Sequence, residues 1–500
     1  MLLSELSKEI RNAAVAGNAD PEILSVSCDS REVEPGALFA ALRGSRDDGQ
    51  RYIREAVDRG AAAVLTHTGA DGDPGVPRIL VEEPRKALGE AADAFYKHPS
   101  RKITLLGVTG TNGKTTTAYL VRHLLNSNGV RCGMLGTIEY DNGRDSIPSP
   151  LTTPDAVAFT RFLAEMVENG CRAAVAETSS HALEQRRVWP HQFSAAIFTN
   201  LTRDHLDYHQ TMETYLEAKR ILFRELGSEA AAVVNLDDPH AAKMRESVAA
   251  RVFGFSLAPG AAASDDKAAV EIIASDLRGQ AFRAEGAGLA GEYFVPLVGM
   301  HNVQNATGAL MALAAIGVEP KGLREALRSF PPVPGRLERM ESPAGVTAFV
   351  DYSHTDGALR SVLGVLRPLL GAGRLITVFG CGGDRDRGKR PLMARAAEER
   401  SDLVVVTSDN PRTEDPLAII DDVMKGFKES GKVKVDPDRA RAVELAVSGA
   451  RPGDVILVAG KGHENYQILG KQKIHLDDRE LVRDAFRRFE RRRGGNETDS

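Results

Sequence analysis

The sequence predicts an α/β protein built mainly from parallel sheets, and three observations support this fold class. Short apolar runs alternate with helix-like segments along most of the 500 residues. A glycine-rich segment, GVTGTNGKTTT at 107–117, lies between an apolar run and a helix-like run. The length corresponds to about three average domains. Alternating strands and helices form layered domains whose strands are mostly parallel.

The expected strands are short runs of small and branched apolar residues, typical of strands buried in a sheet. They lie at 64–65, 79–81, 173–176, 195–198, 231–234, 375–379, 403–406 and 455–459. Segments 154–169 and 213–226 are expected to be helices. The Ala-, Gly- and Asp-rich segment 254–285 is expected to hold irregular hairpins, and the charged end 487–500 a frayed, solvated helix.

Two linkers divide the chain. A polar turn at 96–101 precedes the apolar run 103–106, and three prolines with a glycine at 330–336 end a helical pattern. We therefore expect domains at 1–98, 99–333 and 334–500.

Composition excludes several classes of function. A net charge of −5 argues against a general nucleic-acid binder. The four cysteines are far apart and form no CxxC pair, which is typical of reduced cytoplasmic thiols. No apolar run reaches the roughly 18 residues of a membrane span, and the first residues do not resemble a signal peptide. We expect a cytoplasmic protein without membrane insertion.

Segment 107–117 is predicted to bind the phosphates of a nucleoside triphosphate. A glycine-rich turn between a strand and a helix directs N–H groups and the helix dipole at an anion. Lys114 adds a charge for the outer phosphates and Thr115 a hydroxyl for Mg²⁺. The spacing departs from the usual Walker A motif because Val108 stands where its first glycine belongs. The alternative is a tight structural turn. The residues expected to contact the nucleotide are Gly110, Thr111, Asn112, Gly113, Lys114, Thr115 and Thr116.

Polar residues also follow the next two strands. Glu177 is the first charged residue after run 173–176, where α/β proteins place ligands, and its carboxylate is a candidate for Mg²⁺. A helix N-cap partner is the alternative. His205 and Asp207 follow run 195–198 and are further candidate metal ligands. Lys219 lies in a helical segment and, on its own, reads as a solvent-facing lysine.

Several other polar residues allow two interpretations each. Ser179, Gln185 and Arg187 suit either a binding turn or an ordinary surface. Asn302 and Asn305 either cap a helix or recognise a base edge. Arg336 and Asp351, just after the second linker, suit a nucleotide enclosed between domains or an ion-paired linker.

Three loops of the last domain follow apolar strands and carry glycine and charge, at 380–390, 409–412 and 460–464. Loops at the carboxyl edge of a sheet define a ligand cleft. The candidate residues are Arg385, Asp409, Asn410, Pro411, Arg412, Gly460 and Glu464.

In this order, the motifs resemble those of the Mur ligase family over nearly the whole chain. They are DSR, GVTGTNGKTTT, AETSSH, FTNLTRDHLDYH with EAK, HNVQNA, GRLE, VDYSHT, GGDRDRGKRP, DNPR and GKGHE. The resemblance implies a smaller N-terminal UDP-binding domain that includes loop 44–49, a central ATPase and a Rossmann-like C-terminal domain. It implies an ATP-dependent amide-forming ligase that joins meso-diaminopimelate or L-lysine to UDP-N-acetylmuramoyl-L-alanyl-D-glutamate, acting as a monomer.

The resemblance also implies roles for individual residues. The catalytic residues would be Lys114, Glu177, His205 and Lys219. The Mg²⁺ site would comprise Thr115, Glu177, His205 and Lys219, the lysine as a carbamate formed with CO₂. Asn302, Asn305, Arg336 and Asp351 would complete the ATP site. The UDP-substrate would contact Ser30, Thr152, Thr153, Ser179, Gln185 and Arg187.

The DNPR motif favours diaminopimelate as the incoming amino acid. In the family, the arginine of this motif binds the carboxylate at the far end of that substrate, which L-lysine lacks, so an unpaired Arg412 would penalise lysine. One departure is Val350-Asp351-Tyr352-Ser353-His354-Thr355-Asp356, because the family usually has proline at the last of these positions. The lysine-adding ligase, a folylpolyglutamate or cyanophycin synthetase, a mechanical or switch-type P-loop NTPase and a non-catalytic wall-assembly scaffold are the alternatives.

Overall fold

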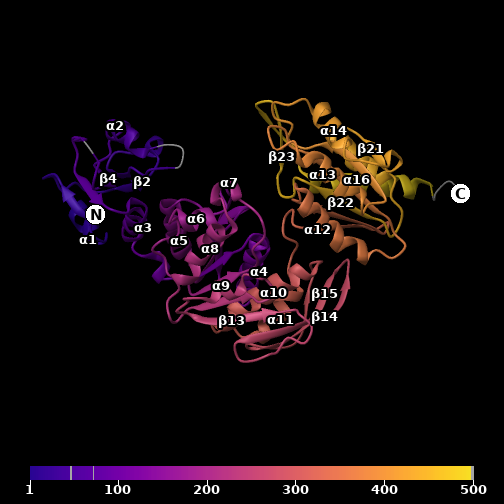
Figure 1. The fold of residues 1–500 in the computed structure, drawn as a ribbon, viewed down its shortest axis with the longest axis horizontal. Coiled ribbons are helices and arrows are strands. Elements are labelled where there is room, and N and C mark those ends of the chain that lie inside the picture. The colour runs from indigo at the N-terminus through magenta and orange to yellow at the C-terminus, as the bar shows by residue number, and fades with distance from the viewer. Residues whose placement is uncertain (45–47, 71, 497–500) are drawn as a thin grey trace. The chain divides into compact units, whose positions relative to one another are not determined.

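The computed structural model describes residues 1–44, 48–70 and 72–496 (Figure 1). Residues 45–47 of the predicted UDP loop and the last four residues of the predicted terminal helix therefore lie outside the described residues. The chain divides into two compact units, each described by itself below. The first comprises Met1–Glu271, Ala284–Gly291 and Gln304–Leu327, and the second Ile272–Arg283, Glu292–Val303 and Arg328–Ser500.

The N-terminal part of the first unit is built on a five-stranded sheet with the order β1-β5-β4-β3-β2. All its pairs are parallel except β1 with β5. Apolar residues of four strands, β2 to β5, and of α1 and α3 form one core against this sheet. The strands are β1 Ala14–Ala16, β2 Ser25–Ser27, β3 Ala37–Ala40, β4 Ala63–His67 and β5 Arg78–Val81; the helices are α1 Leu3–Lys8, η1 Ser30–Glu32, η2 Gly49–Tyr52, α2 Ile53–Asp58 and α3 Pro84–Phe95.

The central sheet has eleven strands in the order β16-β15-β14-β13-β12-β11-β6-β10-β7-β8-β9. From β13 to β7 the pairing is parallel, as the alternation of strands and helices predicts. Its strands are β6 Thr104–Thr109, β7 Cys132–Leu135, β8 Glu139–Asp141, β9 Ser146–Pro148, β10 Ala173–Glu177, β11 Ala195–Phe198, β12 Ala231–Asn235, β13 Arg251–Ser256, β14 Lys267–Asp276, β15 Gly279–Gly286 and β16 Leu289–Val295.

Helices connect the parallel strands of this sheet and begin at recognisable caps. Asp155 accepts hydrogen bonds from the N–H groups of Val157 and Ala158 at the start of α5, and Thr211 accepts one from Thr214 at the start of α8. The helices of this part are η3 Pro99–Arg101, α4 Lys114–Ser127, α5 Ala156–Glu168, α6 Ser180–Glu184, α7 Leu206–His209, α8 Met212–Arg224, α9 Ala241–Arg245, α10 Met300–Ala315 and α11 Pro320–Arg328.

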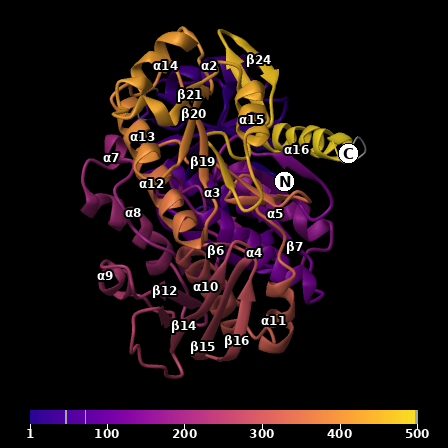
Figure 2. The same cartoon turned by 90° about the vertical axis from the view of Figure 1, so that its right-hand side faces the viewer.

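The last domain has a six-stranded sheet, β17-β18-β22-β19-β20-β21, parallel except for β17. Alternate residues of the four inner strands, β18, β22, β19 and β20, face opposite cores. For example, Phe379 packs with α12, α13 and α14, whereas Val378 packs with α15 and α16. Figure 2 shows α12 and α13 on one side of β19 and β20 and α15 on the other. The strands are β17 Glu338–Ser342, β18 Val346–Asp351, β19 Leu375–Cys381, β20 Leu403–Ser408, β21 Val433–Val435 and β22 Val455–Ala459, with a separate hairpin of β23 Tyr466–Leu469 and β24 Gln472–His475; the helices are α12 Asp356–Leu366, η4 Arg367–Leu369, α13 Lys389–Glu398, α14 Pro416–Met424, η5 Ser430–Lys432, α15 Arg439–Ser448 and α16 Asp478–Asn496.

One local prediction was wrong. Most of segment 254–285 lies in regular strands, at the end of β13, in β14 and in β15, because Val270, Phe282 and Ala284 alternate with exposed residues and are buried. At the other predicted segment, residues 487–496 are helical and form the end of α16. Most of the described side chains there are exposed, but Phe489 is buried against α15. Within the described parts of the chain, no helix is long and apolar enough to cross a membrane.

Candidate active site

The predicted phosphate loop lies between β6 and the N-terminus of α4, as the sequence indicates. Gly110 and Gly113 have φ values of +152° and +86°, which L side chains rarely adopt. A Cβ at Gly113 would lie 2.4 Å from Oδ1 of Asn305, a predicted nucleotide contact in α10. Glycine is therefore needed here both for the backbone conformation and for the close approach of the asparagine.

The segment after β11 holds the phosphate loop in place. Asn200 accepts hydrogen bonds from Thr111 N–H with its carbonyl at 2.9 Å and from Asn112 N–H with its side-chain Oδ1 at 3.0 Å. Thr199 Oγ1 donates to the Asn112 carbonyl at 2.6 Å. Thr111 Oγ1 also contacts the hydroxyl of Tyr215 at 3.2 Å. These bonds preorganise a loop whose sequence is rich in glycine.

Two lysines donate to one carbonyl of this loop. Lys114 Nζ and Lys219 Nζ lie 2.9 and 2.8 Å from the Gly110 oxygen. Lys219 is 1% exposed, and its amine also lies over the ring of Tyr215, 4.4 Å from its centroid. Burial, and then the neighbouring charge of Lys114, holds the pKa of Lys219 well below its usual range. The interpretation of Lys219 as a solvent-facing lysine was wrong.

Glu177 ends β10 and is completely buried. Its Oε2 accepts hydrogen bonds from Thr115 Oγ1 at 3.0 Å and from Thr137 Oγ1 at 2.9 Å, and its Oε1 accepts one from Thr137 N–H at 2.8 Å. The N-cap of α6 is Ser179, so Glu177 is not the cap of that helix. The structure thus brings together the carboxylate and the hydroxyl that were predicted to hold Mg²⁺.

His205 is the N-cap of α7 and has a left-handed backbone, φ +52°. Its ring lies 5.0 Å from that of His181 and 6.2 Å from that of Tyr215, between centroids. No hydrogen bond joins it to Glu177 or Lys219. In the described chain no three His, Cys, Asp or Glu side chains converge as a ready-made metal site. A cation here would need the Thr115 hydroxyl and a modified Lys219 beside Glu177, and a buried lysine of lowered pKa fits that modification.

Most of the predicted UDP-substrate residues form one hydrogen-bonded group next to Glu177. Thr153 Oγ1 donates to the Glu177 carbonyl at 2.6 Å and accepts from Ser179 N–H at 3.1 Å. Arg187 donates to the Thr153 carbonyl at 3.1 Å and to Gln185 Oε1 at 2.7 Å. Of the two remaining residues, Thr152 contacts Thr137, whereas Ser30 lies in the N-terminal domain and donates to Glu55.

A cavity of about 280 Å³ lies between β3, β4, the start of α3 and the end of α6. Four cationic side chains line it together with two carboxylates. None of the predicted UDP-substrate residues lies on its wall. The cations are Arg43, Arg85, Lys86 and Arg186, and the carboxylates Glu83 and Glu184.

In the second unit, Arg336 and Asp351 both follow the second linker, but neither forms an ion pair with a described residue. Arg336 lies over the ring of Tyr352, 4.9 Å from its centroid, and its buried Nε has no hydrogen-bond partner among the described residues. Asp351 accepts from Leu337 N–H at 2.8 Å and Ser353 N–H at 2.9 Å. The interpretation as an ion-paired linker was therefore wrong.

The DNPR loop follows β20, and it places the Arg412 side chain beside the loop after β19. Arg412 Nη1 donates to the Gly383 carbonyl at 2.7 Å. Its backbone is left-handed, φ +53°, and pairs with the β23–β24 hairpin through Ile468 and Gly470. Nε and Nη2 have no partner in the described structure. Arg385 is exposed in the neighbouring loop and forms no ion pair with another described residue.

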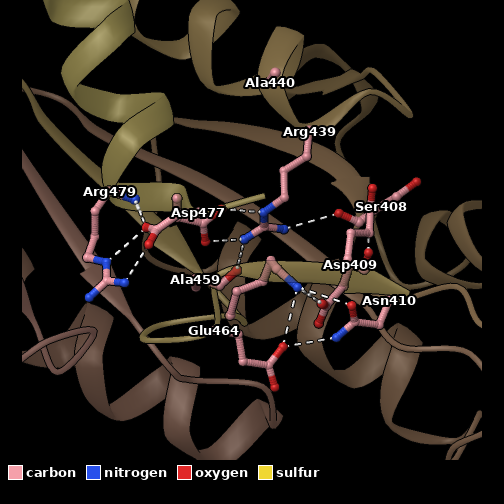
Figure 3. Close-up of polar contacts among 12 residues, drawn as sticks. Ser408, Asp409, Asn410, Arg439, Ala440, Ala459, Glu464, Asp477 and Arg479 are labelled. Atoms are coloured by element: carbon pink, nitrogen blue, oxygen red, sulfur yellow. Dashed lines mark hydrogen bonds and ion pairs between the residues drawn. The ribbon is translucent and has the colours of Figure 1, made fainter. Parts of the chain in front are cut away.

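Asp409, Asn410 and Glu464 converge at the carboxyl ends of β20 and β22 (Figure 3). Asn410 Nδ2 donates to Glu464 Oε2 at 3.0 Å, and Lys461 contacts all three side chains. Gly460, φ +114°, places the loop so that a Cβ there would lie 3.5 Å from Asp409 Oδ2. Pro411 accepts from Glu414 N–H. Thus all seven residues predicted from this region lie in three loops at one edge of the sheet.

Comparison with known proteins identifies three regions. Residues 22–96 match the Mur ligase family catalytic domain, 108–313 the Mur ligase middle domain and 335–462 the glutamate ligase domain of Mur ligases. The UDP-N-acetylmuramoyl-L-alanyl-D-glutamate--2,6-diaminopimelate ligase of Geobacter metallireducens is 42% identical, with 97% of this chain and 98% of that protein covered. The ligase of the same name from Gloeobacter violaceus is 44% identical over 93% and 94%. The chain belongs to the Mur ligase family.

A solved structure of a UDP-N-acetylmuramoyl-L-alanyl-D-glutamate--2,6-diaminopimelate ligase is similar to this Mur ligase, with a TM-score of 0.69 and 34% identity over 93% of this chain and 94% of that one. The predicted three-domain α/β fold is confirmed.

Sequence reasoning missed several residues of this Mur ligase's candidate site. Thr137 and Tyr215 contact Glu177 and the phosphate loop from segments with no motif of their own. Asn200 and Lys461 are different, because they lie inside the FTNLTRDHLDYH and GKGHE motifs and could have been considered. The cavity cations could not be found from sequence, because they come from three separate segments, at 43, 85–86 and 186.

Proposed function

We propose that this Mur ligase joins meso-diaminopimelate to the D-glutamate side-chain carboxylate of UDP-N-acetylmuramoyl-L-alanyl-D-glutamate, at the expense of ATP. The names of relatives that align over almost the whole chain support this assignment. The observation that carries it is the side chain of Arg412. Its Nη1 donates to the Gly383 carbonyl, which leaves the N–H groups of Nε and Nη2 for the carboxylate at the far end of diaminopimelate. Two parallel N–H groups of a guanidinium match a carboxylate, which L-lysine lacks at that end.

The proposed chemistry begins with activation of the acceptor carboxylate. One oxygen of the glutamate side chain attacks the γ-phosphorus of ATP, ADP leaves, and an acyl phosphate forms. Lys114 at the start of α4 supplies positive charge, and the N–H groups of the loop and the helix dipole bind the phosphates. The amine of diaminopimelate then attacks the carbonyl carbon, loses a proton, and phosphate leaves.

We propose that Lys219 is carbamylated and that, with Thr115, Glu177 and His205, it holds Mg²⁺. The buried neutral amine attacks CO₂ and loses a proton, which converts a cation into an oxygen ligand. Bound Mg²⁺ would neutralise charge on the transferring phosphoryl group. The contribution of the chain itself is to lower the pKa of Lys219, which favours the neutral amine, and to keep the Glu177 carboxylate hydrogen-bonded and buried.

The remaining substrate contacts are also proposals. Asn302, Asn305, Arg336 and Asp351 would bind the base and sugar of ATP. The basic cavity beside α3 would hold the UDP group, because a diphosphate and a planar base suit four cations around a cavity of about 280 Å³. The UDP-linked peptide would then extend toward Thr153, Ser179 and Arg187 in the same unit.

Each domain would bind one substrate. Residues 1–98 would bind the UDP group, residues 99–333 would bind ATP, and residues 334–500 would bind the amino acid. The enzyme would act as a monomer in the cytoplasm, with no nucleic-acid partner and no membrane insertion. Three substrates on three domains allow the reacting groups to be brought together by binding, which contributes roughly 7–11 kcal/mol in favourable cases.

An acceptor assay tests the proposal against its closest alternative. Enzyme, ATP and UDP-linked dipeptide are incubated with meso-diaminopimelate or with L-lysine, and phosphate release is measured. We expect release to depend on both the dipeptide and diaminopimelate. Greater release with lysine would favour the lysine-adding ligase, and release without any dipeptide would favour a simple NTPase.

A further inference from the structure

We propose that Lys461 is a positioning residue that sets the geometry and the net charge of the amino-acid pocket. This inference rests on the proposed diaminopimelate-binding role of the loops after β20 and β22. Lys461 follows β22, and its side chain is 0% exposed. Nothing in the proposed reaction uses it directly.

The ammonium of Lys461 is shared by three side chains of the pocket. Its Nζ lies 3.4 Å from Asp409 Oδ1, 3.2 Å from Asn410 Oδ1 and 3.3 Å from Glu464 Oε2. An ammonium has three N–H donors, so these acceptors use all of them. Lys461 therefore has no donor left for a substrate carboxylate, and its effect must pass through the residues that it contacts.

These contacts join two loops that are not neighbours in the sheet. Asp409 and Asn410 follow β20, whereas Lys461 and Glu464 follow β22, and β19 lies between the two strands. Asn410 also accepts from Ile468 N–H of the hairpin at 3.0 Å with the same Oδ1 that faces Lys461. Lys461 thus fixes the loop that carries Arg412 relative to the loop that carries Glu464.

Charge gives a second reason for a buried lysine at this point. Asp409 and Glu464 carry two formal negative charges, and Lys461 carries one positive charge. The formal net charge of these three residues, the charged trio, is therefore −1. A single negative charge matches the distal ammonium of the incoming amino acid. Without Lys461, the carboxylates of Asp409 and Glu464 would lose the cation that pairs with both of them. Removal of one partner from a buried ion pair is strongly destabilising, because it leaves an uncompensated charge.

The test is steady-state kinetics of Lys461→Met, with Lys473→Met as the matched control. Both lysines lie over the ring of Tyr466, at 5.5 and 3.6 Å, but only Lys461 is buried and paired with carboxylates. For Lys461→Met we expect the KM for diaminopimelate to rise about tenfold or more while the KM for ATP stays within about twofold. Lys473→Met should leave both constants unchanged.

A double variant separates charge from packing. Lys461→Met with Asp409→Asn returns the trio to a net charge of −1, so the KM for diaminopimelate should recover by at least about threefold relative to Lys461→Met. If Lys461→Met is insoluble, Lys461→Gln keeps a donor without the charge and should show the same selective rise.

Three results would overturn the inference: an unchanged KM for diaminopimelate, an equal rise in both KM values, or no recovery in the double variant. A wild-type enzyme that does not ligate diaminopimelate would instead overturn the proposed function, and the inference with it.

Discussion

Arg412→Ala should remove the carboxylate-binding group of the amino-acid pocket without altering the loop that carries it. The backbone of Arg412 is left-handed, donates to the Ile468 carbonyl at 3.0 Å and accepts from Gly470 N–H at 2.7 Å. Alanine keeps the same N–H and C=O groups and has a Cβ like arginine, so the cost of a positive φ is unchanged. The substitution therefore reports on the guanidinium alone.

The magnitude follows from the hydrogen bonds that the guanidinium can make. Gly383 holds Nη1 at 2.7 Å, and Nε and Nη2 can reach one substrate carboxylate. Two hydrogen bonds to a charged group contribute about 1.5–3 kcal/mol each. In the variant, water can donate some of the hydrogen bonds that the substrate carboxylate loses. We therefore take the lower end of the range for the two bonds together, about 3 kcal/mol. That corresponds to a loss on the order of 10²-fold in kcat/KM for diaminopimelate.

Phosphate release measured against diaminopimelate and ATP in turn checks this expectation. Arg387→Ala is the matched control, because Arg387 lies in the neighbouring loop, is 69% exposed and pairs with Glu414 at 3.0 Å. An exposed ion pair contributes about 0–1 kcal/mol, so the control should change kcat/KM by less than about fivefold.

Equal losses toward diaminopimelate and ATP would refute the reasoning, since they would indicate a collapsed domain rather than a missing contact. A loss of less than about fivefold toward diaminopimelate would also refute it, because it would place the substrate carboxylate elsewhere. Lysine use should not fall with the variant, as lysine has no carboxylate at that end.

Three further predictions concern the first unit. Lys219→Met should abolish most turnover and remove the carbamate signal that we expect carbon-13 NMR to show for wild-type enzyme supplied with labelled bicarbonate. Gly113→Ala should eliminate ATP binding in calorimetry, because the added Cβ would lie 2.4 Å from Asn305 Oδ1 at a φ of +86°. Burial lowers the pKa of His191 from 6.5 to about 4. As the pH falls, this histidine is therefore protonated in the unfolded chain before it is protonated in the folded protein. The free energy of unfolding should therefore fall by about 3 kcal/mol between pH 6.5 and 4, and urea unfolding of His191→Gln should show a smaller fall.

The central fold was predictable because buried parallel strands have a strong local signature. The run of alanines and valines at 173–176 and the run at 455–459 became β10 and β22, each buried along its whole length. The segment 254–285 was not predictable in the same way. Its strands bury alternate residues such as Val270 and Phe282, and Phe282 stacks on Tyr293 of β16, which lies outside the segment. The glycines of the segment suggested turns instead.

The candidate site was predictable only where strand ends carry unusual residues. Glu177, Asp409 and Gly460 directly follow or end apolar runs, and the carboxyl edge of a parallel sheet brings such positions together. Thr137 acts through two hydrogen bonds to Glu177, 40 positions away, and nothing in its own sequence surroundings marks that partner. Asn200 lies inside the FTNLTRDHLDYH motif, but the motif does not reveal its partner Asn112, 88 positions away. Only the structure reveals these contacts.

The two lysines on the Gly110 carbonyl provide an argument for the proposed carbamate that does not depend on resemblance. Both amines lie within 3 Å of the same oxygen, and one of them is almost completely buried. Two ammonium groups in such a place repel each other, and burial penalises the charge on Lys219 most. A neutral amine is the form that attacks CO₂, and the resulting negative carbamate would attract Lys114 instead of repelling it. Modification would thus relieve an unfavourable contact in the phosphate loop and, in the same step, provide an oxygen ligand beside Glu177.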